Sequence, residues 1–183
     1  MGGARGLAVV AVFTALVVST DFAMAPLWNV KLMDTVVFVV AFAFGFREGA
    51  AVAVLSESVW SFVSPVGAAG LMTPFLVGGE VLFAAAGWGA SRVWALDGKR
   101  DRAAPVYIGA AMAVCAFLWD LETNAATALI WGGAGLSAAT LAATEAAGFL
   151  FPFPLAHELA DLAMGILIAP AAIVVIPRAM RRG

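Results

Sequence analysis

Long apolar runs recur along the whole 183-residue chain, and they limit its possible folds more than any other feature. A transmembrane helix needs about 20 mostly apolar residues, whereas a strand of a membrane barrel needs only about 10 residues of alternating polarity. The runs here are long and do not alternate, so they predict helices. Because 63% of the residues are hydrophobic and 12% are charged, polar side chains are too few to cover a soluble fold. We therefore predict an all-α integral membrane protein.

Prolines, glycines and charged segments divide the chain into six predicted transmembrane helices within one membrane domain, residues 1–183. The predicted spans cover about residues 6–25, 32–46, 49–63, 75–90, 105–131 and 155–176. Arg47-Glu48 is predicted to form a very short turn between the second and third spans, and the Gly/Pro-rich stretch 64–74 a loop. The Ala-rich stretch 136–151 is interpreted as a lid or surface helix on the outer face.

The distribution of basic residues predicts the orientation of the spans. With six spans and a cytoplasmic N-terminus, the outer side receives only Lys31. The inner side receives the other nine of the ten Lys and Arg residues: Arg5, Arg47, Arg92, Lys99, Arg100, Arg102, Arg178, Arg181 and Arg182. Cytoplasmic loops carry an excess of Lys and Arg. We therefore expect both termini in the cytoplasm and the chain in the plasma membrane, whereas a seventh crossing would break this pattern.

Carboxylates are unusually frequent within the predicted spans. Eight of the twelve lie in or beside a span: Asp21, Asp34, Glu57, Glu80, Asp120, Glu122, Glu158 and Asp161. A charged group at the bilayer centre costs about 2.5–3.5 kcal/mol on insertion scales, so it normally faces the bundle interior or water. Hydration at a span end explains Asp21, Asp34 and Glu158 equally well. The set as a whole predicts a cup open to the outside, which favours a cationic or neutral ligand over an anion.

Tryptophans accompany two of these acids. Trp60 lies three residues after Glu57, on the same helix face, and Trp119 adjoins Asp120. An aromatic belt at the membrane interface explains tryptophans near span ends. The alternative is that the rings stack on a flat ligand or face a cation.

His157 is the only histidine of the chain. It lies four residues before Asp161, so a hydrogen bond that orients the imidazole is expected between the two side chains. A transition-metal site usually recruits more nitrogen or sulfur ligands than one histidine supplies. We therefore predict neither a metal site nor a cofactor.

Small residues lie four apart in the first span, at Ala11 and Ala15. This spacing lets two helices approach closely in lipid. Two explanations remain open at this point: packing inside the bundle, or a docking surface for another membrane protein.

These features together resemble the substrate-binding S components of energy-coupling factor (ECF) vitamin transporters. The similarity covers nearly the whole chain: six spans, both ends cytoplasmic, and the alanine spacing of the first span. Three segments add to it: Phe-Gly-Phe-Arg-Glu-Gly-Ala at 44–50, Trp-Asp-Leu-Glu-Thr-Asn at 119–124, and Phe-Pro-Phe-Pro-Leu-Ala-His at 151–157.

The resemblance implies that the chain captures a vitamin or related micronutrient outside the cell. Import would then be driven by a transmembrane coupling subunit, contacted at Ala11 and Ala15, and by two cytoplasmic ATPases. The acidic cup suits a cationic ring such as thiamine, and a near-neutral corrinoid is also compatible. The branch that binds nickel or cobalt through an N-terminal histidine is not matched by Met1–Ala4. The candidate pocket residues are Glu57, Trp60, Glu80, Trp119, Asp120, Asn124, His157 and Asp161.

Two further classes remain as alternatives. Intramembrane acids are common in proton- or cation-coupled secondary transporters and channels, although no inverted repeat is visible. An intramembrane enzyme is disfavoured, because His157-Glu158 lacks the second histidine of a metalloprotease motif and no Gly-x-Ser-x-Gly is present. The chain also lacks a phosphate-binding Gly-Lys loop. We therefore expect no enzymatic activity and no nucleic-acid partner.

Overall fold

A computed structural model describes residues 3–27, 29–65, 67–93, 103–131, 137–150 and 155–181, and within them it contains helices and no strand. The helices are α1 (Gly3–Met24), α2 (Met33–Phe44), α3 (Phe46–Val63), the short 3₁₀ helix η1 (Gly70–Met72), α4 (Thr73–Val93), α5 (Ala104–Trp131), α6 (Ala138–Leu150), α7 (Ala156–Leu167) and α8 (Ala169–Arg181). The all-α prediction is confirmed. The basic segment 94–102 and the Phe-Pro-Phe-Pro motif at 151–154 lie outside the described residues.

Among the described residues, three stretches are long and apolar enough to cross a membrane: α1, η1 with α4, and α5. The bent pair of α7 and α8 counts as a fourth if it forms one span. Helix α2 is apolar but has only 12 residues, and α3 carries three charged side chains among its 18 residues. Several helices can therefore span a membrane by length and composition, but these lengths do not establish the six predicted crossings.

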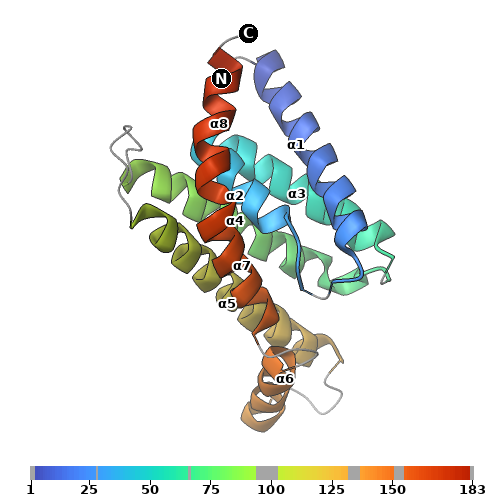
Figure 1. Cartoon of the computed structure of the whole chain (residues 1–183). Coiled ribbons are helices and arrows are strands. Elements are labelled where there is room, and N and C mark those ends of the chain that lie inside the picture. Colours follow the sequence, from blue (N-terminus) through green and yellow to red (C-terminus); the bar gives the residue numbers. More distant parts are fainter. Residues whose placement is uncertain are drawn as a thin grey trace.

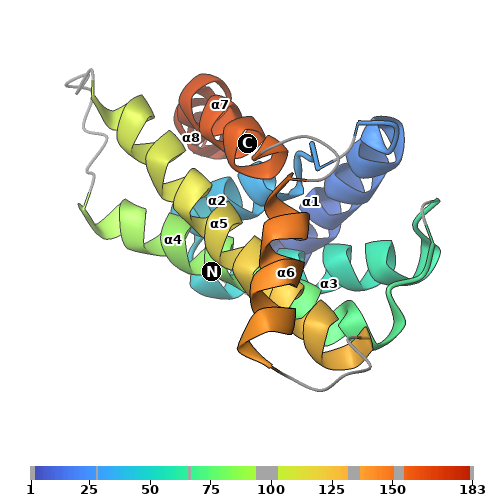
Figure 2. The same ribbon diagram turned by 90° about the horizontal axis from the view of Figure 1, so that it is seen from below.

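The helices form one bundle around α2 (Figure 1). Helix α2 packs against α3 and α4, α5 packs against α7, and α1 packs against α3. The beginning of α1 and the end of α8 lie at the same end of the molecule (Figure 1). Helix α6 lies at the opposite end, where it crosses α5 (Figure 2). The stretch predicted to be a lid or surface helix is thus a short helix at one end of the bundle.

The connection between α2 and α3 differs from the predicted turn at Arg47-Glu48. The two helices are separated by Gly45 alone, whose φ of 115° is readily adopted only by glycine. Arg47 and Glu48 instead belong to the first turn of α3, where a carboxylate is stabilised by the helix dipole. The predicted loop 64–74 is also partly helical, because Pro74 fits the first turn of α4.

The last predicted span, 155–176, is not one continuous helix. It consists of α7 and α8, which are bent by 43° relative to each other. Pro170 has no backbone N–H, and its ring clashes with the carbonyl of the residue four before it. Helix α7 therefore ends at Leu167, after which the Ile168 N–H bonds to the Met164 carbonyl, and a new helix begins.

Polarity is distributed in the reverse of a soluble protein. Leu7, Phe62 and Leu167 are each more than two-thirds exposed, at 72%, 68% and 75%. The buried polar residues are Asp21, Asp34, Thr35, Ser56, Glu57, Ser61, Glu80, Thr123, His157 and Asp161. An apolar exterior around a charged interior is the arrangement expected in lipid, where charged groups avoid the hydrocarbon.

Candidate functional site

Carboxylates from five helices are buried in the interior of the bundle. They are Asp21 on α1, Asp34 on α2, Glu57 on α3, Glu80 on α4 and Asp161 on α7, each at most 1% exposed. The hydration explanation offered for Asp21 and Asp34 does not hold, because both are fully covered. We call these five residues, together with Asp120 and His157, the acidic cluster.

His157 joins three of the acids. Its Nδ1 lies 3.0 Å from Oδ1 of Asp120 on α5, so the ring N–H donates to that carboxylate. Its Nε2 faces Oδ2 of Asp34 at 3.4 Å and Oδ2 of Asp161 at 3.8 Å. The predicted hydrogen bond between His157 and Asp161 is therefore not formed, because 3.8 Å exceeds hydrogen-bond range. Asp120, on a different helix, orients the imidazole instead.

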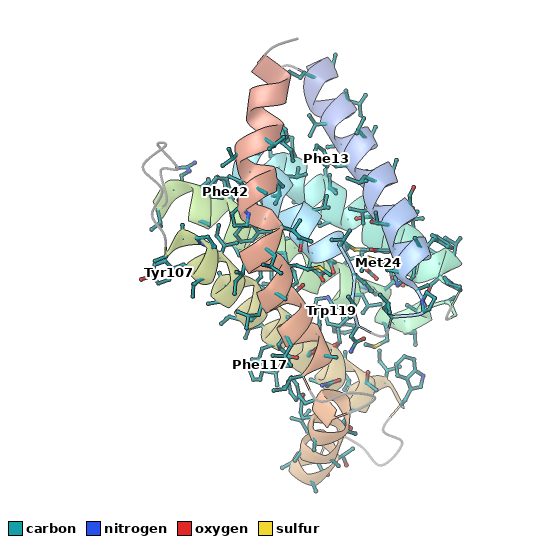
Figure 3. All side chains as sticks on the ribbon, viewed as in Figure 1. Phe13, Met24, Phe42, Tyr107, Phe117 and Trp119 are labelled. Atoms are coloured by element: carbon teal, nitrogen blue, oxygen red, sulfur yellow. The ribbon has the colours of Figure 1, made fainter. Side chains whose placement is uncertain are left out.

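Trp119 borders the acidic cluster. Its ring lies edge-on to the His157 ring, with centroids 5.1 Å apart, and its Nε1–H donates to the Leu76 carbonyl at 3.2 Å. Gly79 of α4 makes room for the indole, since a Cβ there would overlap it. Figure 3 places Trp119 inside the bundle, whereas Tyr107 and Phe117 of the same helix lie on the outside, 52% and 45% exposed.

Lys31, in the connection between α1 and α2, supplies a cation beside these acids. Its Nζ lies 5.3 Å from the ring centroid of Trp60 and 6.0 Å from that of Trp119, within the range of cation–π attraction. Burial lowers the pKa of the Lys31 ammonium, but nearby carboxylates, led by Glu57 and Asp34, outweigh burial and raise that pKa above its ordinary value. Lys31 is therefore charged at neutral pH.

Two small cavities adjoin Lys31. The larger has a volume of about 160 Å³, and its lining includes Asp21, Asn29 and Trp60. The smaller, of about 10 Å³, is lined by Asn29, Lys31, Asp34, Glu80, Trp119 and His157, and such a space holds about one water molecule. Sites for drug-sized ligands typically measure about 300–1,000 Å³. An organic ligand of that size therefore requires Lys31 or its neighbours to move aside.

Seven of the eight predicted pocket residues lie in or beside the acidic cluster: Glu57, Trp60, Glu80, Trp119, Asp120, His157 and Asp161. Asn124 does not, because its Nδ2 donates to Oε2 of Glu145 on α6 at 3.3 Å. Sequence reasoning missed the roles of Lys31 and of Ser61, whose hydroxyl donates to Oε1 of Glu57 at 2.9 Å. The four-residue spacing of Ser61 and Glu57 is the sequence signal that reveals their contact.

The small-residue face of α1 lies on the outside of the bundle. Ala11 and Ala15 are both exposed, and the buried residues of α1 are Val9, Val17 and Asp21. Of the two explanations for the alanine spacing, packing inside the bundle is therefore not supported by their positions.

No family model, curated protein or solved structure matches this chain. Its function is therefore argued from the acidic cluster and from the surface of the bundle.

Proposed function

We propose that the chain is the substrate-binding S component of an ECF-type importer in the plasma membrane. It captures a small cationic or near-neutral ring compound, a vitamin or related micronutrient, from the outer face. The observation that carries this proposal is the placement of Lys31, whose ammonium lies against two indole rings and whose side chain lines the same small cavity as Asp34 and Glu80. The bundle thus already places one organic cation, partly exposed, against indole rings beside its buried acids.

The same contacts give a physical basis for ligand recognition. Indole faces attract cations, more strongly when water is excluded, and a buried carboxylate is stable only with a partner. The Lys31 ammonium supplies a positive charge near these carboxylates while the ligand is absent. A cationic ligand takes over that role when it enters, which makes the site selective for positive charge. The ligand then occupies the larger cavity beside Trp60, widened by the displacement of Lys31.

The surface of the bundle supports coupling to partner subunits. The exposed Ala11 and Ala15 allow another helix to approach α1 closely in lipid, and we assign this face to the transmembrane coupling subunit, which is driven by two cytoplasmic ATPases. We also propose six crossings in which α2 and α3 complete the apolar helices, with α6 on the outer surface. An even number of crossings agrees with α1 beginning and α8 ending at the same end of the molecule (Figure 1).

The first experiment is mass spectrometry of small molecules released from the gently purified chain, followed by binding of thiamine as a probe cation. We expect Glu57→Ala to weaken thiamine binding by roughly 10–100-fold, because a hydrogen bond to a charged group contributes about 1.5–3 kcal/mol. Glu122→Gln, a substitution of a carboxylate outside the acidic cluster, is the control and should bind as the wild type does. Tight binding of an anionic vitamin, or equal affinity of both variants, contradicts the proposal.

A proton- or cation-coupled carrier is the second candidate. The buried pairing of His157 with carboxylates favours this candidate, because such groups exchange protons in carriers of this class. Reconstituted vesicles separate the two candidates. An S component gives ATP-dependent uptake only with coupling subunits present. A carrier takes up solute when a proton gradient is imposed across the vesicle membrane, with the chain reconstituted alone.

A further inference from the structure

Three buried side chains of the acidic cluster present donor atoms to one point. They are Asp34 of α2 with Asp161 and His157 of α7, and one ligand atom from each lies within 4.8 Å of the others. Asp34 and Asp161 are 1% exposed and His157 is 7% exposed. We infer that these three side chains bind one divalent first-row transition-metal ion, and that Asp120 holds the imidazole in the orientation needed for ligation.

The carboxylate oxygens at this point lack hydrogen-bond partners. Among the described residues, neither oxygen of Asp34 nor Oδ2 of Asp161 accepts a hydrogen bond. Burying an unpaired carboxylate is costly, so such groups are normally paired or bound to a metal. The carboxylates of Asp34 and Asp161 face the same point, which indicates that a cation binds between them.

The orientation of His157 strengthens this inference. Donation from Nδ1–H to Asp120 leaves Nε2 with its lone pair in the neutral ring, directed at the oxygens of Asp34 and Asp161. A proton shared with either oxygen would draw the atoms to about 2.7–3.2 Å, but the distances are 3.4 and 3.8 Å. Ligands about 2.0–2.2 Å from one metal ion lie about 3.0–3.5 Å apart. The 3.4 Å separation from Asp34 lies within this range, and Asp161 needs to approach by only a few tenths of an ångström to complete the site.

The surroundings suit a dication. A ligating histidine usually donates its other N–H to a carboxylate, which is the role that Asp120 fills. The cluster holds six carboxylates against the one Lys31 ammonium beside it, so two further positive charges reduce an existing excess. Imidazole with carboxylates suits ions such as Mn²⁺ and Zn²⁺. The cavity of about 10 Å³ beside Asp34 and His157 has room for a water ligand.

The sequence offers a direct probe, because His157 is the only histidine. The whole chain, purified without a histidine tag and treated with a chelator, is labelled with ¹⁵N-histidine and titrated with Zn²⁺. We expect the Nε2 resonance of the folded protein to shift and to saturate at one Zn²⁺ per chain. An imidazole spectrum unchanged by one equivalent of Zn²⁺ overturns the inference. This measurement requires no substitution, so it does not depend on whether a variant folds.

Variants then identify the ligands by Zn²⁺ and Mn²⁺ affinity. Asp34→Asn and Asp161→Asn should abolish one-to-one binding, and Asp120→Asn should weaken it by roughly 10–100-fold, as is typical for a group that orients a ligand. Glu158→Gln, adjacent to His157 but outside the three donors, is the matched control and should retain wild-type affinity. Equal affinity of Asp161→Asn and Glu158→Gln contradicts the assignment. Metal affinity is measured on the isolated chain without transport, so failure here and failure of the proposed vitamin uptake are separate results.

Discussion

At the scale of single residues, Lys31 determines how the acidic cluster is compensated. The chain buries carboxylates from several helices, and such charges are tolerated only when cations, protons or donors balance them. Lys31 provides one fixed positive charge on a short connection between α1 and α2. Its side chain also fills space beside Trp60 and Trp119, so charge balance and the size of the binding space depend on the same residue.

Replacing Lys31 with Met should therefore have two opposite effects. The folded state should lose about 1–3 kcal/mol, because the partner carboxylates are left uncompensated, while thiamine should bind more tightly because the internal competitor is gone. The pKa of Lys31 is raised, so its stabilisation is fully present at neutral pH and is lost only as the pH rises through that raised value. Thermal unfolding followed by tryptophan fluorescence, with thiamine titration, measures both effects.

The control is Lys31→Arg, which keeps the charge and should resemble the wild type in both measurements. Arginine stays charged at any pH used for unfolding, so the difference between Lys31→Arg and Lys31→Met measures the effect of the positive charge. A Lys31→Met protein with unchanged stability and unchanged thiamine affinity would show that the ammonium does not compensate the cluster.

The sequence predicted the acids of the site better than their partners. Glu57, Glu80 and Asp161 can be recognised from the sequence. A carboxylate deep in an apolar run costs free energy in the membrane, which indicates that it faces the bundle interior or water. Asp34 and Lys31 lie at a helix end, where hydration is an equally good local explanation. Their burial depends on how α2 packs against α3 and α4, which no local pattern encodes.

At the scale of helices, close contact between backbones holds the bundle together. Gly165 of α7 faces Gly109 of α5, and a Cβ on Gly165 would lie 2.6 Å from the Gly109 Cα. Gly87 of α4 lies similarly close to the Phe38 carbonyl of α2. Small residues at such crossings let helices pack tightly in lipid, and the α5–α7 crossing brings Asp120 within reach of His157.

Gly165→Ala should consequently destabilise the protein. The added methyl meets backbone atoms that cannot rotate away, and overpacking of this kind costs about 1–3 kcal/mol. Gly89→Ala is the matched control, because nothing lies within 4 Å of a Cβ at that position, and alanine there should gain up to about 1 kcal/mol from helix propensity. Thermal unfolding of both variants in the same detergent tests this, and equal melting temperatures would contradict the close crossing.

Apolar runs predicted the long helices well, as the observed α1 and α5 show, but they did not reveal local breaks. Gly45 and Pro170 act through backbone geometry, one by accepting a positive φ and the other by lacking an N–H. Neither changes the average polarity of its segment. The hydropathy pattern therefore predicted α7 and α8 as one helix. It also predicted the turn between α2 and α3 at Arg47, two residues after the observed break at Gly45.

At the scale of the whole molecule, the number of crossings depends on α2 and α3. In the part of the chain that the structure describes, three or four helices can span a membrane by length and composition, whereas α2 has 12 residues. The six predicted crossings came from the apolar runs. The count of Lys and Arg on each side gave their orientation and disfavoured a seventh crossing, and that count uses the segment 94–102, outside the described residues. The charge count thus depends partly on a segment outside the described residues, whereas helix length is taken from the described residues alone.

The proposed docking role of α1 can be tested separately from ligand binding. In vesicles with the coupling subunit and ATPases, Ala15→Leu should abolish ATP-driven thiamine uptake, because added bulk keeps the partner helix from approaching, while thiamine binding to the isolated chain should be unchanged. Ala110→Leu, at an exposed alanine of α5, is the control and should transport normally. If Ala15→Leu lowers binding and uptake together, Ala15 belongs to the structure of the bundle and not to a docking face.

Helix α1 has two faces with different surroundings, and this has a mechanical consequence. Ala11 and Ala15 are exposed on the outside of the bundle, while Asp21, six residues after Ala15, is buried in the interior. The short connection that carries Lys31 follows the end of this helix. A rigid helix that is tilted at one end swings at the other. Under the proposed docking on the alanine face, a neighbour that tilts α1 would move the Asp21 carboxylate and, through the short connection, Lys31, and would thereby change the charge balance inside the bundle.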